Sequence, residues 1–263
     1  MLSYLLENKE VNGVRTVERF RKKFEDDPGT FMQVDRATKG ETETILFNID
    51  YEGSINKDKT AVLRVFAKVF YNHLGFFGSN LKVAMLEQYI TQQGKMDEFC
   101  RLIEEKKGKP WTEVRKAFAF NGKFIKPALA EALDISEEDA NNWFNDKSAT
   151  ELSVSQLVED INAYVSTKPA NFRLLFMVDE VGQYVGTDTD MLLNLQSLVE
   201  KIGSECRGKV WVVCTGQEAI DEIINVRADE FSRIQARFKT RLSLSSSSVD
   251  EVCLLYTSDA ADD

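Results

Sequence analysis

Two short apolar runs, each closing in polar residues, stand out in the hydrophobic pattern of the chain. The first, Phe172–Glu180, is apolar until it ends in Asp179 and Glu180. The second, Lys209–Thr215, is apolar until it ends in Thr215. Bounded apolar runs of this length are typical of buried strands that are covered on both faces, as in parallel sheets. The sequence therefore predicts two buried strands with polar tips.

A helical pattern joins the two runs. Met191–Ile202 repeats apolar residues at helical spacing, and strand, helix and strand in this order predict a right-handed parallel crossover. The carboxyl ends of parallel strands meet at one edge of a sheet, where ligands bind. We therefore expect Thr215 and Gln217 to lie beside Asp179 and Glu180.

A further strand is predicted before these two. Thr44–Tyr51 is rich in β-branched and aromatic residues and has Asp50 near its end. Asp58 is expected to cap the helix that follows, and Gly75 to stop it. The Asp26–Gly29 stretch is predicted to be a turn.

Between the strands, the pattern from Leu81 to about Thr167 is almost wholly helical and predicts a helical insertion within one sheet. The charged run Glu104–Lys107 in it is interpreted as a solvated helical face. The predicted domains are 1–80, the N-terminal part of the sheet-containing core; 81–168, the helical insertion; 169–252, the C-terminal part of the core; and 253–263, a tail that is not native sequence.

Composition is that of an ordinary soluble globular protein, with 43% hydrophobic and 29% charged residues in 263. The formal net charge of -10 argues against a nucleic-acid-binding surface overall and leaves a local basic patch open. No apolar run suggests a membrane span and no signal-peptide layout is present, so we expect a cytoplasmic protein without membrane contact.

Catalysis by histidine or zinc is disfavoured. His73 is the only histidine, which excludes multi-histidine metal sites, and it is interpreted as a surface or packing residue. The four cysteines show no C-x-x-C spacing, so they are expected to be reduced thiols.

The two carboxylates at the first strand tip suit nucleotide hydrolysis. In a P-loop nucleoside triphosphatase, an Asp at this place orients the water shell of a magnesium ion, and the Glu after it polarises the attacking water. Asp179 and Glu180 match this Walker B arrangement. The alternative is a strand that simply meets a solvated turn.

The other candidate residues also leave two interpretations open. Thr215 or Gln217 suits a sensor of the same water or of a γ-phosphate, or caps only the next helix. Arg233 and Arg237 are four residues apart on one helix face. They suit an arginine finger that reaches a neighbouring subunit's phosphate, or pair with nearby acids and solvent.

The phosphate-binding loop of such an enzyme is absent from the sequence. No G-x-x-x-x-G-K-[ST] occurs in it, so no backbone cradle for phosphates is predicted. Helical spacing begins at Met1 without a capping residue, and we expect the loop to lie just upstream.

Three stretches resemble a known family. Leu174–Tyr184, Leu193–Gln196 and Phe231–Ser245 are similar to the P-loop ATPase of BREX bacteriophage-defence systems, called BrxC or PglY. The resemblance implies an α/β fold in which an incomplete, AAA+-like parallel sheet is flanked by helices.

The resemblance also implies a function. ATP and Mg²⁺ are the expected cofactors of the longer protein, with Asp179 at the metal, Glu180 catalytic, Thr215 or Gln217 at the nucleotide and Arg233 or Arg237 as the finger. Expected partners are other phage-defence proteins and further copies of the chain. DNA would be contacted only indirectly or through regions outside these residues. Without the phosphate loop, the 263 residues alone are expected to be inactive.

Two rival functions remain. One is a nucleotide-gated scaffold that assembles defence proteins with little or no turnover, suggested by the helical insertion and the acidic composition. The other is a magnesium nuclease using Asp50 and Asp179, which is weakened because no Glu-x-Lys follows on a strand.

Overall fold

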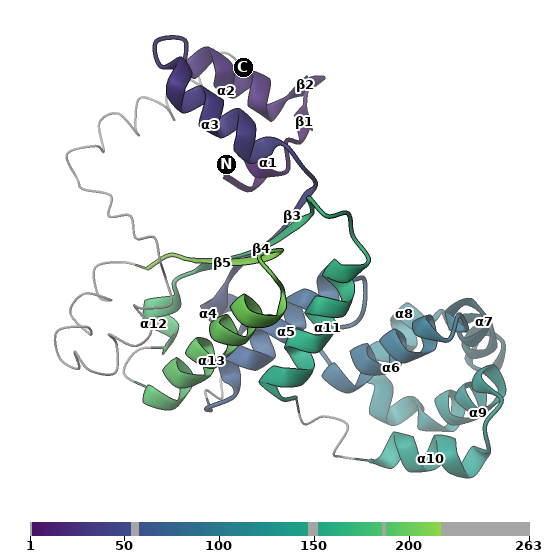
Figure 1. Cartoon of the computed structure of the whole chain (residues 1–263). Coiled ribbons are helices and arrows are strands. Elements are labelled where there is room, and N and C mark those ends of the chain that lie inside the picture. The colour runs from purple at the N-terminus through teal and green to yellow at the C-terminus, as the bar shows by residue number, and fades with distance from the viewer. Residues whose placement is uncertain (1, 54–57, 147–151, 186–187, 217–263) are drawn as a thin grey trace.

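The computed structural model describes residues 2–53, 58–146, 152–185 and 188–216. They contain a parallel sheet with the strand order β3-β4-β5, formed by β3 (Thr42–Asn48), β4 (Arg173–Asp179) and β5 (Val210–Cys214). Helices flank this sheet (Figure 1). The predicted α/β fold with a parallel sheet is therefore confirmed, whereas a P-loop NTPase fold stays a prediction.

The central strand is β4, and its sequence explains this position. Leu174–Val178 is buried throughout, as expected for a strand with neighbours on both sides and cover on both faces. The parallel register places Asn48 of β3 opposite Asp179, and Cys214 of β5 opposite Val178. The carboxyl ends of the strands thus meet at one edge.

One face of the sheet carries the main hydrophobic core. Three helices cover it: α5 (Ala61–His73), α11 (Val154–Ser166) and α13 (Thr189–Glu205), which lie below the sheet in Figure 1. The Phe66 ring of α5 lies 5.5 Å from the Phe47 ring and 5.4 Å from the Phe176 ring.

The opposite face of the sheet is partly exposed, which corrects the prediction that Lys209–Thr215 is buried on both faces. Trp211 is 56% exposed and Val213 37%. Side chains alternate along a strand, so Val210 packs on the core face while Trp211 and Val213 point the other way. On β3, Leu46 shares the second face through the register and is 64% exposed.

The N-terminal elements were only partly predicted. They are α1 (Leu2–Leu6), β1 (Glu10–Val11), β2 (Val14–Arg15), α2 (Thr16–Lys23) and α3 (Pro28–Thr38). The predicted turn at Asp26–Gly29 is found in part, because Phe24–Asp26 is a turn between α2 and α3 whereas Pro28 and Gly29 begin α3. The Asp27 side chain caps this helix by accepting a hydrogen bond from Thr30 N at 3.0 Å.

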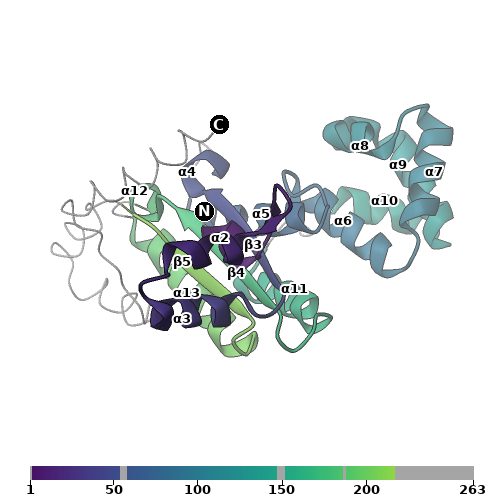
Figure 2. The same ribbon diagram turned by 90° about the horizontal axis from the view of Figure 1, so that it is seen from above.

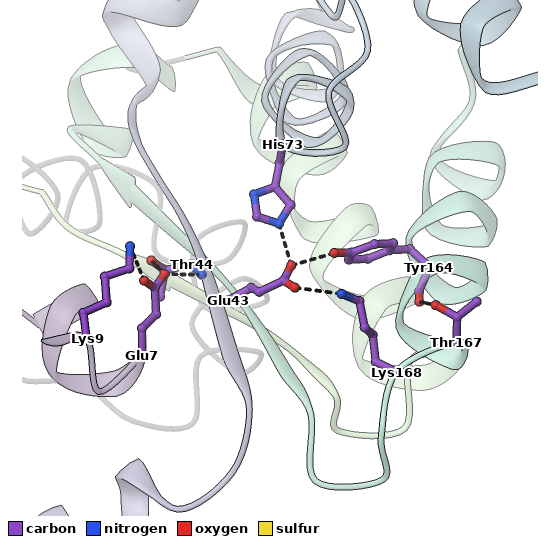
Figure 3. Close-up of polar contacts among 8 residues, drawn as sticks. All are labelled: Glu7, Lys9, Glu43, Thr44, His73, Tyr164, Thr167 and Lys168. Atoms are coloured by element: carbon purple, nitrogen blue, oxygen red, sulfur yellow. Dashed lines mark hydrogen bonds and ion pairs between the residues drawn. The ribbon is translucent and has the colours of Figure 1, made fainter. Parts of the chain in front are cut away.

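The outer edge of β3 is occupied by a side chain from the segment after α1. Glu7 Oε1 accepts a hydrogen bond from Thr44 N at 2.8 Å and another from the Thr44 hydroxyl, and Glu7 also pairs with Lys9 (Figure 3). An edge backbone donor of the sheet is therefore satisfied within the chain.

Helices fill the chain between β3 and β4, as predicted. The helices α6 to α10 form a module with its own core, in which the Phe99 and Trp111 rings lie 5.0 Å apart. This module stands to one side of the sheet in Figures 1 and 2. Its elements are α6 (Leu81–Gln92), α7 (Met96–Lys107), α8 (Trp111–Val114), the 3-10 helix η1 (Arg115–Asn121), α9 (Gly122–Leu133) and α10 (Glu137–Asn145).

The last helix of the predicted insertion, α11, packs with the sheet core instead of with this module. The predicted domain boundaries are not tested by these contacts. Within the described ranges, no helix has both the length and the apolar character needed to cross a membrane.

Candidate functional site

The polar tips of β4 and β5 are joined, as the sequence predicted. The Thr215 hydroxyl donates a hydrogen bond to Asp179 Oδ1. Two backbone bonds hold Thr215 in this place: Thr215 N donates to Val178 O at 2.9 Å, and Val181 N donates to Thr215 O at 3.2 Å. The parallel pairing of the strands is thus continued by one residue beyond β5.

Asp179 is exposed at the end of the buried central strand. Thr215 uses its Oδ1, and Oδ2 makes no hydrogen bond to a described residue. The carboxylate is therefore held through one of its two oxygens. No cluster of three or more His, Cys, Asp or Glu side chains occurs among the described residues.

This donor set fits magnesium. Mg²⁺ keeps several of its waters and is commonly held in proteins by one or two carboxylates together with substrate phosphates. The described residues offer such a single carboxylate and not an all-protein cage. Asp179 is the residue that would hold the ion.

Glu180 has an unusual backbone. Its φ is +62°, in the left-handed region that side chains other than glycine rarely adopt. This residue turns the chain from β4 into the short helix α12 (Val181–Val185), where Tyr184 N donates to Glu180 O at 3.2 Å. Non-glycine residues in this region cost of order 1 kcal/mol or more and cluster at functional sites.

The chain continues from Glu180 directly into α12. Tyr184 on this helix packs against Gly53, where an added Cβ would lie 2.6 Å from the ring. Burial raises the pKa of the Tyr184 hydroxyl, Arg64 lowers it, and Asp50 and Asp58 raise it.

Arg64 is a cation near the site that sequence reasoning missed. It lies in the first turns of α5, and its Nη1 is 3.0 Å and 2.9 Å from the two carboxylate oxygens of Asp58. The only signal in the sequence was its spacing from Asp58, which was expected to be a helix cap. The Asp58 side chain accepts from Thr60 N at 2.8 Å, one residue before the helix begins.

Asp50 does not lie at a strand tip, which corrects the predicted strand Thr44–Tyr51. β3 ends at Asn48, and α4 (Ile49–Glu52) begins immediately after it. Asn48 causes the change, because its Oδ1 accepts from Asp50 N at 3.0 Å and from Tyr51 N at 3.2 Å. The residue opposite Asp179 is therefore an amide, and the nuclease hypothesis loses its second strand-tip carboxylate.

The remaining predicted site residues, Gln217, Arg233 and Arg237, lie outside the described residues. Their placement beside Asp179 and Glu180 stays a prediction. The part of the site that the structure describes consists of Asp179, Glu180 and Thr215.

A second polar cluster lies at the other end of β3 and joins three elements. Glu43 of β3 accepts from Tyr164 at 2.7 Å and Lys168 at 2.8 Å, and its Oε2 lies 2.6 Å from His73 Nε2 (Figure 3). Burial opposes ionisation, but the hydrogen bonds from Lys168, Tyr164 and His73 outweigh it and lower the pKa of Glu43 to about 2. His73 is thus a partly buried packing residue, as predicted.

One cavity lies among the N-terminal elements. It measures about 580 Å³ and is lined by residues of the N-terminal elements, including Glu7, Arg15 and Gly40. Gly40 precedes β3, so this cavity lies at the amino edge of the parallel sheet. Its position does not support a link to the carboxyl-edge site.

No family model matches the chain, and no solved structure matches it. The similarity to the BREX ATPases therefore stays a prediction that rests on the sequence motifs.

Proposed function

We propose that the chain supplies the water-activating half of a nucleoside triphosphatase site in an AAA+-like, BREX-type defence ATPase. The observation that supports this most is the hydrogen bond between Thr215 and Asp179, made at the carboxyl edge of a parallel sheet. It joins the predicted metal carboxylate to the predicted sensor.

In this proposal each side chain has one task. Asp179 holds the water shell of Mg²⁺, which when bound would neutralise charge on the phosphates. Glu180 accepts a proton from the attacking water, and its left-handed backbone ends the path of β4 at this residue. Thr215 fixes the Asp179 carboxylate through Oδ1 and leaves Oδ2 for the metal waters.

The same proposal includes residues and partners beyond the described part. Gln217 would contact the nucleotide, and Arg233 or Arg237 would reach the phosphates of a neighbouring copy in a homo-oligomer. ATP is the proposed nucleotide, and other phage-defence proteins are the proposed partners.

The test uses a chain extended upstream so that it includes a phosphate-binding loop. Glu180→Gln should retain ATP binding and lose hydrolysis by about 100-fold or more, because the general base is removed while the shape is kept. Glu159→Gln, on the exposed side of α11, is the matched control. Unchanged turnover in Glu180→Gln would contradict the assignment of Glu180 as the general base.

A second candidate is the nucleotide-gated scaffold. The separate core of α6 to α10 favours it, because a module with its own core can present a binding surface without disturbing the sheet. Co-purification with candidate defence proteins, with and without ATP, separates the two proposals. Assembly that ignores ATP would contradict gating.

A further inference from the structure

The helical module contains a stretch whose charge is opposite to that of the whole chain. Between Lys106 and Lys126 every charged residue except Glu113 is basic, although the chain has a formal net charge of -10. The basic residues are Lys106, Lys107, Lys109, Arg115, Lys116, Lys123 and Lys126. Such a local reversal is a candidate anion-binding surface.

Three of these cations are already paired. Arg115 lies 2.8 Å from the buried Glu87, Lys106 lies 2.7 Å from Glu131, and Lys109 lies 3.3 Å from Glu113. The other four make no ion pair with a described residue: Lys107, Lys116, Lys123 and Lys126. Lys126 Nζ donates to the neutral Asn141 Oδ1 at 2.6 Å, so none of these four ammonium groups is paired with a described carboxylate and each keeps its charge for another anion.

An exposed aromatic residue lies between Lys116 and Lys123 in the sequence. Phe120 of η1 is 90% exposed. The turn around it is held firmly, since Asn121 Nδ2 donates to Val114 O at 3.1 Å and to Ala117 O at 3.0 Å. Phe118 points inward and stacks on Phe144 at 4.7 Å. The Phe120 ring is therefore exposed to solvent next to a hydrogen-bonded turn.

The Phe124 ring brings two of the lysines together. The Lys107 Nζ lies 4.5 Å and the Lys123 Nζ 4.8 Å from the centre of the Phe124 ring, so one aromatic face gathers two cations. Lys126 is placed in the same way, 5.0 Å from the Phe144 ring. A single exposed Phe side chain is ordinary on a protein surface. The exposure of Phe120, in a hydrogen-bonded turn close in sequence to several cations, calls for a functional explanation.

We propose that the surface of Lys107, Lys116, Phe120, Lys123 and Lys126, here called the basic surface, binds single-stranded nucleic acid. A base stacks on the Phe120 ring while the ammonium groups contact the phosphates. An acidic peptide would satisfy the lysines and leave the ring unused. A duplex keeps its base faces stacked internally and would not use Phe120 either.

The experiment measures fluorescence anisotropy of a labelled short oligothymidylate with the full chain, from ~50 to ~200 mM salt. Phe120→Ala should weaken binding about tenfold, as loss of one stacked base does. Lys116→Gln with Lys123→Gln should reduce the slope of log affinity against log salt by about 1.4. Tyr89→Ala, another exposed aromatic, and Lys22→Gln with Lys23→Gln on α2 are the matched controls.

The outcomes are distinct. Binding that falls in Phe120→Ala but not in Tyr89→Ala supports the proposal, and an oligouridylate run in parallel shows which sugar is preferred. Three results overturn it: no binding by the unaltered chain, equal affinity for a duplex, or displacement by oligoglutamate with no effect of Phe120→Ala, which would indicate an acidic protein partner. None of these readouts involves nucleotide hydrolysis.

Discussion

Thr215 and Asp179 are 36 residues apart in the sequence and are joined by a hydrogen bond from the hydroxyl to Oδ1. Thr215→Val keeps the shape of the side chain and removes this bond. We expect a small loss of unfolding free energy, about 1 kcal/mol or less, because both groups are exposed. Hydrolysis by an extended chain should fall further, by about tenfold, since Asp179 loses its orienting partner.

Urea unfolding of the chain and turnover of the extended chain measure these two effects. Thr215→Ser keeps the hydroxyl and should retain turnover. Full activity in Thr215→Val would show that the bond has no part in positioning Asp179.

Glu180 offers a test that separates backbone strain from chemistry. Its φ of +62° suits glycine, so Glu180→Gly should have an unfolding free energy higher than that of Glu180→Ala by about 1 kcal/mol. Both variants lack the carboxylate and should be equally inactive in the extended chain. Urea denaturation of the two proteins decides the matter, and equal stabilities would argue against the left-handed conformation.

The ionised Glu43 side chain should make the unfolding free energy fall in acid. Its folded pKa of about 2 lies below the ordinary value of 4.5, so its contribution is present above pH 4.5 and is lost as the pH falls towards 2. Glu43→Gln should flatten the acid limb of a plot of unfolding free energy against pH. Glu159→Gln serves as the exposed control, and an unchanged acid limb in Glu43→Gln would contradict the network in Figure 3.

Replacement of Glu87 should cause a large loss of stability in the helical module. It is 1% exposed and accepts from Trp111 Nε1 at 2.6 Å, Arg115 at 2.8 Å and Phe77 N at 2.6 Å. Glu87→Gln leaves the Arg115 guanidinium without a counter-charge, at a cost of about 3 kcal/mol. Thermal unfolding followed by tryptophan fluorescence should show this, while Glu113→Gln at the surface should change little. A loss below 1 kcal/mol would argue against the buried pair.

Much of the sheet could be predicted from the sequence because strand periodicity and polar tips are local signals. β4 and the meeting of Thr215 with Asp179 followed from two apolar runs and a helix between them. Asp50 was misplaced because the capping strength of Asn48 ended the strand earlier than its β-branched pattern indicated. Capping competes with strand propensity and is decided by one side chain.

Other features had weaker signals. The strands β1 and β2 are joined by a tight turn at Asn12 and Gly13, both of which have positive φ. The Asn-Gly pair is the sequence signal from which this hairpin could have been predicted. The exposure of Trp211 could not be predicted, because an apolar strand reads the same whether one or both faces are covered. The pairing of Arg64 with Asp58 depends on how the chain before α5 turns, which no local pattern encodes.

The Glu7 carboxylate accepts a hydrogen bond from the Thr44 amide, and this bond affects at which edge a further strand could join the sheet. A strand that joined the sheet beside β3 would have to displace a hydrogen bond of 2.8 Å made to an acceptor from the same chain. Among the described strands the order is β3-β4-β5, so β5 forms the other edge of the described sheet. A strand added there in parallel would lie next to Thr215 and bring its own carboxyl end to the same edge as Asp179.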